Sequence, residues 1–362
     1  MTKRKTLPII LTVMVAVVVF ALPLMIPSAS MTFFAMLVLT AIIVTGVTLL
    51  MGYTNQVSLG QGAFFAISAL VTALLAQAEV PPIVAFLVGP TVAGLFAAVV
   101  GYPLTRLRGH YLAFGTLALQ IIVITVATNT DWFGGPFGIQ AVPQFSIGGF
   151  EIKDARGYVY FALIMLALVL FVAYRVVHSR FGRGIRAMSV SESAAASAGI
   201  PIARYRLTVF VLSAVFAGFA GAIYPFLIGY VSASSFPIIT SFQYVAMAVI
   251  GGAASLWGGV VGVAIVMILI QWLSVLGTTP GMPETAPAIL SYAVYAVALI
   301  LVIMLIPQGL VPWVTSLFKR RGDVDPSADS ATSLITVQSA SRIPPSANRS
   351  PAPGSSDSSS SG

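Results

Sequence analysis

Repeated runs of apolar residues, each long enough to cross a lipid bilayer as a helix, restrict the fold of this chain most strongly. A helix needs about 20 such residues to span the hydrocarbon core, and residues 31–51, 83–102, 158–177 and 207–230 form runs of this kind. The sequence is 58% hydrophobic and only 8% charged, with a mean hydropathy of +0.99. A soluble domain carries roughly 25% charged residues. We therefore predict an all-α polytopic membrane protein.

Polar, glycine-rich and proline-rich breaks divide the apolar sequence into ten predicted segments. They cover residues 7–26, 31–51, a third ending near 78, 83–102, 111–128, 158–177, 207–230, an eighth beginning near 238, a ninth ending near 276 and a tenth ending near 306. Two of these ten segments, beside Asn55 and Gly252, can be half-spans or re-entrant pieces that do not cross the bilayer. We therefore predict about 8–10 transmembrane helices. The first run exceeds the roughly 7–15 apolar residues of a signal peptide, so we expect an uncleaved helix there.

Positive charges at the ends of these segments predict the orientation of the chain. With ten spans, nearly all of them fall on one side: residues 3–5, Arg106, Arg108, the arginines between Arg175 and Arg206, and residues 319–321. Lys and Arg favour the cytoplasmic side of membrane proteins. We therefore expect a multi-pass protein of the bacterial inner membrane with both termini in the cytoplasm. The same rule accounts for the net charge of +8, so we expect no nucleic-acid partner.

The stretch Arg175–Arg206 combines six of the 18 Lys and Arg residues with the signals of a short helix. The Ser191 hydroxyl can cap a helix, and the carboxylate of Glu192 suits the positive end of its dipole. The run Ala194–Ala198 favours helix, and Gly199 can end it in a left-handed conformation. We predict a short cytoplasmic helix whose small side chains fit a cleft on a partner. A solvated loop fixed inside by its arginines is the alternative.

A polar, glycine-rich break, Gly52–Gly62, separates the second and third segments. Within it and beyond it, Ser58, Gln61, Ser68 and Thr72 are expected to share roughly one helical face. Polar faces inside membrane helices point either to a water-filled path or to hydrogen bonds that hold helices together, and the sequence leaves both open. The candidate path residues are Asn55, Gln56, Ser58, Gln61, Ser68, Thr72 and Gln120.

A set of glycines marks expected helix breaks and points of close helix packing, since glycine lets backbones approach closely. Its members are Gly60, Gly62, Gly218, Gly221, Gly251, Gly252 and Gly258. From residue 322 onward the chain is rich in Ser and Pro, which predicts a disordered cytoplasmic tail over residues 322–362.

The sequence lacks the residues that an enzyme or a self-powered transporter needs. No charged residue or histidine lies in the middle of a predicted span, where proton-coupled transporters usually carry one. The sequence has no phosphate-loop motif and no cysteine, and its two histidines, His110 and His178, lie near arginines. We expect no catalytic residue, metal or cofactor. The prediction is a permease subunit driven by a separate ATPase, with a secondary transporter or a passive channel as alternatives.

Four stretches carry motifs that occur together: Gly52–Phe65, Leu107–Ala113, Ser179–Ile200 and Val249–Gly258. The third contains Ser-Arg-x-Gly-Arg followed by Glu-x-Ala-Ala and Gly-Ile, and the fourth has a Gly-Gly-x-x-Ser-Leu-Trp-Gly turn. In this order they resemble the M-type inner-membrane permease subunits of branched-chain amino acid ABC transporters. The resemblance covers most of residues 30–310.

The resemblance implies a transmembrane permease domain over residues 1–321 that imports branched-chain or related hydrophobic amino acids. It implies a coupling helix, seated in a groove of an ATPase subunit, and assigns to it Arg183, Glu192, Ala194, Ala195 and Gly199. It also implies a second homologous permease subunit, two cytoplasmic ATP-binding subunits that bind the ATP, and an external, periplasmic substrate-binding protein.

Three positions depart from the pattern of the family. Asn55 stands where the family commonly has Gly, Gln61 where it often has His, and Ala253 replaces a third glycine of the later turn. These positions lie where a substrate path is expected. A permease for urea or short amides in the same family is therefore an alternative.

Overall fold

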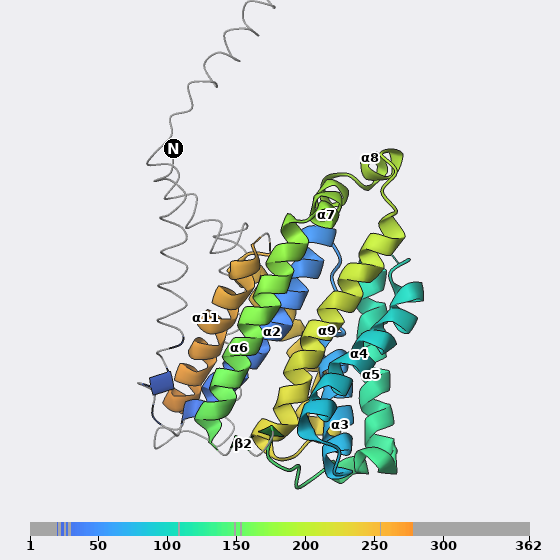
Figure 1. Cartoon of the computed structure of the whole chain (residues 1–362). Helices are drawn as coiled ribbons and strands as arrows, with labels where there is room; N and C mark the ends of the chain where they lie inside the picture. The colour runs from blue at the N-terminus through green and yellow to red at the C-terminus, as the bar shows by residue number, and fades with distance from the viewer. Residues whose placement is uncertain are drawn as a thin grey trace, which may run out of the picture. The chain divides into compact units, whose positions relative to one another are not determined.

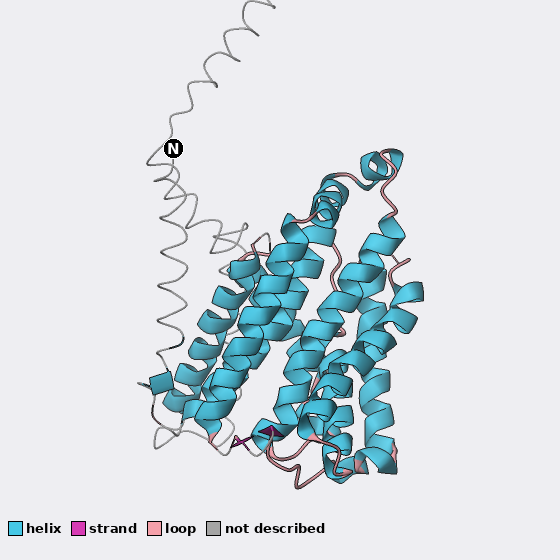
Figure 2. Ribbon diagram, viewed as in Figure 1, coloured by secondary structure: helices cyan, strands magenta, loops and turns pink. Residues whose placement is uncertain are grey.

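The computed structural model describes residues 30–277, apart from 108, 148, 149, 153 and 254, together with residues 20, 23, 24 and 27. Helices dominate this part of the chain (Figures 1 and 2). They are α2 (Met31–Thr54), α3 (Gln61–Gln77), α4 (Pro82–Leu104), α5 (His110–Asn129), α6 (Ala155–His178), α7 (Arg180–Val190), α8 (Glu192–Ser197), α9 (Ile202–Ile228), α10 (Ile238–Gly251) and α11 (Leu256–Gly277). The predicted all-α membrane fold is confirmed.

Within the described residues, six segments are long and apolar enough to cross a membrane. They are Met31–Thr54, Pro82–Leu104, His110–Asn129, Ala155–His178, Ile202–Ile228 and Ala233–Gly251, of which the last combines a short 3-10 turn, η4 (Ala233–Ser235), with α10. Two further apolar stretches, Gln61–Gln77 and Leu256–Trp272, are shorter. The predicted first and tenth helices and the predicted tail lie outside the described residues, which therefore neither confirm nor contradict the predicted total.

Helix α9 is the centre of the packing and contacts α2, α3 and α4 along its length (Figure 1). Two of its glycines make this possible. A Cβ atom built on Gly218 would lie 2.8 Å from Pro90 Cα, and one on Gly221 would lie 2.4 Å from the Phe65 carbonyl oxygen. Both distances are shorter than real side chains tolerate, so the absence of a side chain at these two positions allows α9 to approach α3 and α4 this closely.

The loop between α5 and α6 is rich in turns and also holds two short strands. It contains the 3-10 turns η2 (Asp131–Phe133) and η3 (Gly135–Phe137), followed by β1 (Ser146–Ile147) antiparallel to β2 (Phe150–Glu151). The Phe145 ring fixes this loop to the helices, since its centroid lies 5.0 Å from that of Phe161 and 5.1 Å from that of Phe226.

Helices α3 and α10 are shorter than a full span, and each lies next to a break in the chain. Helix α3 has 17 residues and α10 has 14, whereas a span needs about 20. Helix α10 approaches this length only together with η4, as the 19-residue segment Ala233–Gly251. Figure 1 shows α2 reaching the end of the bundle where α7 lies, while α3 begins further inside. We call residues 55–60 the first break and residues 252–255 the second break.

Candidate functional site

The predicted capped helix is present as α8, at the end of the bundle where α7 also lies (Figure 1). The Ser191 hydroxyl accepts a hydrogen bond from the Ala194 backbone N–H at 3.3 Å, and Glu192 lies in the first turn. Beyond α8, Gly199 has a φ of +80°, the left-handed conformation that glycine tolerates best. Ala194 is exposed and Ala195 is buried, so α8 presents a surface of small side chains.

Helix α7 precedes α8 and was not predicted, because two glycines within six residues disfavour a helix. The structure shows why the glycines are there. A Cβ atom on Gly182 would lie 2.0 Å from the Val177 carbonyl oxygen, and one on Gly184 would lie 2.5 Å from the Tyr205 ring. The signal that could have revealed α7 is the helical spacing of Phe181, Ile185 and Met188. Arg183 lies on the exposed side of α7.

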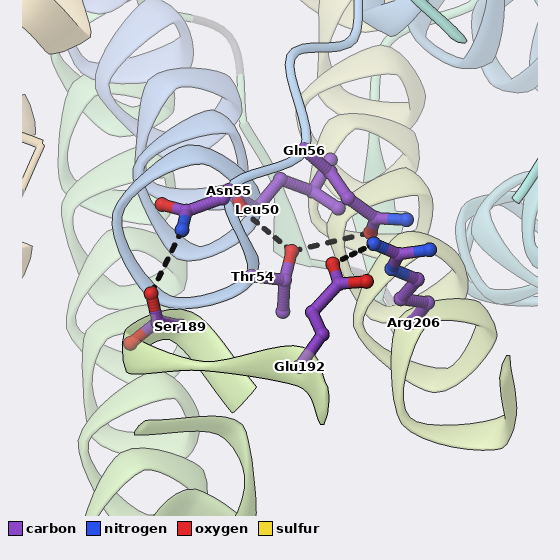
Figure 3. A network of polar contacts seen from close by, with 7 residues as sticks. All are labelled: Leu50, Thr54, Asn55, Gln56, Ser189, Glu192 and Arg206. Carbon is purple, nitrogen blue, oxygen red and sulfur yellow. Dashed lines mark hydrogen bonds and ion pairs between the residues drawn. The ribbon is translucent and has the colours of Figure 1, made fainter. Parts of the chain in front are cut away.

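Polar contacts connect α7 and α8 to α9 and α2 (Figure 3). Glu192 forms an ion pair with Arg206, which belongs to α9. Asn55, at the end of α2, donates a hydrogen bond from Nδ2 to the Ser189 carbonyl oxygen in α7 at 3.0 Å. A movement of α7 and α8 would therefore act on both α9 and α2.

The backbone conformation of Asn55 explains why asparagine can occupy this position. Its φ and ψ are 51° and 31°, in the left-handed region, which Gly and Asn enter more readily than other residues. The next residue, Gln56, is buried, and its Oε1 accepts a hydrogen bond from the Thr54 hydroxyl at 3.1 Å (Figure 3). Side-chain hydrogen bonds close to the C-terminal end of α7 thus hold the start of the first break.

Further inside the bundle, hydroxyl groups of other helices hold the first break and the start of α3. The Leu59 N–H donates to Thr116 Oγ1 of α5 at 2.9 Å, and the Gly62 N–H donates to Ser241 Oγ of α10 at 3.1 Å. Ser241 in turn donates to Gln120 Oε1 at 2.6 Å. Gly62 and Gln120, both chosen from the sequence, are thus joined through Ser241.

The other candidate path residues are buried and contact neighbouring helices. Gln61 donates to Ser213 Oγ of α9 at 2.9 Å, Ser68 to the Gly218 carbonyl oxygen at 2.6 Å, and Thr72 to the Ala85 carbonyl oxygen at 3.3 Å. Interhelical hydrogen bonds of this kind stabilise membrane helix packing. These hydrogen bonds do not test whether the residues line a transport path, so that role stays a prediction.

Three buried amide atoms of the candidate path residues lack a hydrogen-bond partner within the described residues: Gln56 Nε2, Gln61 Oε1 and Gln120 Nε2. The expectation that Ser58 shares a helical face with Gln61 is wrong, because α3 begins only at Gln61 and Ser58 lies in the first break. Ser213 and Ser241 were not selected from the sequence. The only signal in the sequence is a hydroxyl within a predicted membrane segment.

The remaining glycines of the predicted set lie at the two breaks. A Cβ atom on Gly60 would lie 2.9 Å from the Thr116 carbonyl oxygen. At the second break, Cβ atoms on Gly251 and Gly258 would lie 1.7 Å from the Gly258 carbonyl oxygen and 2.3 Å from the Gly252 carbonyl oxygen. Gly252 itself has a φ of +105°. The glycines at the second break therefore allow α10 and α11 to touch backbone to backbone.

Comparison with known proteins assigns the chain to a family. The family described as "Branched-chain amino acid transport system / permease component" matches residues 26–305. The chain belongs to this family. The permease match extends over the whole helix bundle that the structure describes, including both breaks and the α7–α8 region.

Two bacterial proteins are among the curated relatives of this chain. Both are named high-affinity branched-chain amino acid transport system permease protein LivM. The protein from Salmonella typhimurium is 30% identical over 326 residues, which cover 82% of this chain and 73% of the relative. The protein from Escherichia coli is 30% identical over 331 residues, covering 83% and 74%. A probable LivM from Methanocaldococcus jannaschii is 26% identical over 219 residues, covering 58% and 62%. No solved structure matches the chain.

Proposed function

We propose that this chain is the membrane-spanning permease subunit of an ATP-driven importer for branched-chain amino acids. The observation that carries this proposal is the family match over residues 26–305, together with the two LivM relatives at 30% identity. The names of these relatives favour branched-chain amino acids over urea or short amides. The apolar helices of the described residues support a multi-pass membrane protein.

The proposed assembly contains a second homologous permease subunit, two cytoplasmic ATP-binding subunits and an external substrate-binding protein. The sequence itself has no phosphate-loop motif, so ATP is bound and hydrolysed by the partner subunits and this chain needs no cofactor. The positive charge near α7 and α8 supports a bacterial inner-membrane location with these helices and both termini in the cytoplasm.

Helix α8 is the proposed contact with an ATP-binding subunit, with Arg183, Glu192, Ala194, Ala195 and Gly199 as its coupling residues. Its position at one end of the bundle and its small exposed side chains support this role (Figure 1). Closure of the ATP-binding subunits moves α8. The Glu192–Arg206 ion pair passes the movement to α9, and the Asn55–Ser189 hydrogen bond passes it to α2 and the first break.

The substrate passes close to the polar groups of the first break and of α3. Non-helical backbone inside a membrane is tolerated where protein buries it or where it lines a water-filled cavity. Apart from Asn55, which is exposed, and Val57, which is partly exposed, the first break is buried in the structure. Its hydrogen bond to α5, and the bond from the start of α3 to α10, can be exchanged when those helices move. A weak, transient site is enough here, because the external binding protein supplies most of the selectivity.

The proposal is tested by purifying the full chain from its native membrane in mild detergent and measuring ATP-dependent uptake after reconstitution. We expect co-purification of ATP-binding subunits and a second permease, and uptake of leucine only with ATP. In Ala194→Trp the bulky ring would prevent α8 from fitting its groove on the ATP-binding subunit. The ATP-binding subunits should then no longer co-purify with the chain. Gln144→Trp, at an exposed position of the loop between α5 and α6, serves as the control. A chain that purifies alone and moves solute without ATP would contradict the proposal.

A further inference from the structure

An apolar groove lies between the ends of α6 and α9 that adjoin α7. Its volume is about 610 Å³, and it is lined by Phe171, Val172, Arg175, Val176, Ser179, Phe181, Thr208 and Leu212. Ligand sites typically measure roughly 300–1,000 Å³. The groove is therefore large enough for a hydrocarbon chain or a molecule of similar size.

The charge at the mouth of the groove is positive. Arg175 lies in the last turn of α6, with its guanidinium carbon 5.9 Å from the centre of the Phe171 ring. Arg180, which begins α7, is exposed beside the lining residue Phe181. The sequence contains no acidic residue between positions 155 and 190. An occupant with a negative head and an apolar tail matches this arrangement.

The face of α6 that leads to the groove is built for lipid contact. Ile164, Leu168 and Phe171 are 58%, 48% and 60% exposed, and they follow one another at helical spacing down the helix. Contacts between membrane helices favour small residues, as at Gly218 and Gly221 inside this bundle. The exposed residues of α6 within the membrane are mostly large, which favours lipid over a second permease as the neighbour.

We propose that this groove binds one anionic phospholipid of the leaflet facing α7, with the phosphate at Arg175 and an acyl chain between α6 and α9. Basic pockets between membrane helices on the cytoplasmic side bind anionic headgroups in this way. The bound chain also touches Phe181, whose ring stacks on Tyr205 with centroids 4.3 Å apart. The lipid thus completes the junction of α6, α7 and α9.

The experiment uses the full chain with its co-purifying subunits in nanodiscs that contain phosphatidylglycerol with a photoreactive group in the acyl chain. After illumination, labelled peptides are mapped by mass spectrometry. We expect labelling at Val172, Val176 and Leu212. In Arg175→Gln the labelling should fall about fivefold, the effect of one basic residue near an anionic membrane. Arg204→Gln, which removes an exposed arginine outside the groove, should leave it unchanged.

A second variant separates the apolar part of the site from the charge. Leu212→Trp fills the groove and keeps Arg175, so it should lose the acyl-chain labelling. An equal loss of groove labelling in the Arg175→Gln and Arg204→Gln variants would overturn the proposal. So would a phosphatidylcholine probe that labels the groove as strongly as the phosphatidylglycerol probe. Labelling that falls on a second permease or on other segments of this chain, and not on the groove residues, would overturn it too. These results do not depend on which solute the protein imports, so this site and the proposed function can fail separately.

Discussion

The first break, between α2 and α3, is held by side chains of other helices, whereas the second, between α10 and α11, is held by contacts between glycine backbones. At the first break and the start of α3, the Leu59 and Gly62 N–H groups donate to hydroxyls of Thr116 and Ser241. At the second break the N–H groups find local carbonyl oxygens, as in the 3.0 Å bond from the Gly252 N–H to the Ala248 carbonyl oxygen.

This difference separates a break that can rearrange from one that cannot. Hydroxyl and amide side chains can exchange hydrogen-bond partners when α5 or α10 moves. Backbones that touch through Gly251 and Gly258 leave no space for relative movement without loss of packing. The break that contacts α7 through Asn55 is the one with exchangeable partners. We therefore expect substitutions at the second break to affect folding most, and substitutions at the first break to affect transport.

The largest effect is expected for Gly251→Ala. The new Cβ atom would lie 1.7 Å from the Gly258 carbonyl oxygen, and backbone cannot move aside as a side chain can. Overpacking of a tight core costs about 1–3 kcal/mol and occasionally more, and we expect the upper end or beyond. The measurement is the yield of monodisperse protein after detergent extraction. A yield equal to that of the unmodified chain would show that the second break is not a rigid contact.

The same substitution at the first break, Gly62→Ala, should cost less. Its Cβ atom would lie 2.6 Å from Gln120 Nε2 and 2.9 Å from Ser241 Oγ, which are the far ends of side chains that can turn away. We expect a loss of stability of about 1 kcal/mol with near-normal yield, and slower uptake because the Gln120–Ser241 contact is disturbed. The double variant Gly62→Ala with Gln120→Ala provides space for the methyl group and should recover the melting temperature of Gln120→Ala alone.

Thr116→Val tests the hydrogen bond from α5 to the first break. Valine keeps the shape of threonine but leaves the buried Leu59 N–H without its acceptor at 2.9 Å, at a cost of about 1–3 kcal/mol if nothing replaces it. Thr116→Ser keeps the hydroxyl and is the control. A Val variant as stable as the Ser variant would mean that water or another group readily replaces the threonine, so that this hydrogen bond does not hold the break.

The smallest effect on stability, and the most specific effect on transport, is expected for Asn55→Gly. Glycine keeps the left-handed backbone at φ 51° but removes the amide that donates to the Ser189 carbonyl oxygen. The loss of this exposed hydrogen bond costs about 0.5 kcal/mol, the lower end of the range for hydrogen bonds in proteins. We expect the ATP-binding subunits still to co-purify, while fewer substrate molecules are imported per ATP hydrolysed. An unchanged ratio would remove Asn55 from the coupling route and weaken the contrast between the breaks.

The sequence predicted the described helices well, because lipid leaves a membrane chain few choices. Backbone N–H and C=O groups have no water to bind inside a bilayer, so an apolar run of sufficient length must become a helix. The predicted runs 83–102 and 158–177 became α4 (Pro82–Leu104) and α6 (Ala155–His178), with ends shifted by one to three residues. The capped helix α8 was also predictable, since Ser191, Glu192 and Gly199 act on their own local backbone.

The tertiary structure alone decided which polar and glycine residues meet. Nothing local in the sequence pairs Ser241 with Gly62, 179 positions away, or Asn55 with Ser189, 134 positions away. Helix α7 escaped prediction for the same reason, because its glycines are explained by Val177 and Tyr205 rather than by helix propensity. Length and hydropathy fix where a membrane helix forms, since the solvent acts on each segment separately. The contacts that tie α8 to the first break depend on how the helices pack, and packing is a property of the whole bundle.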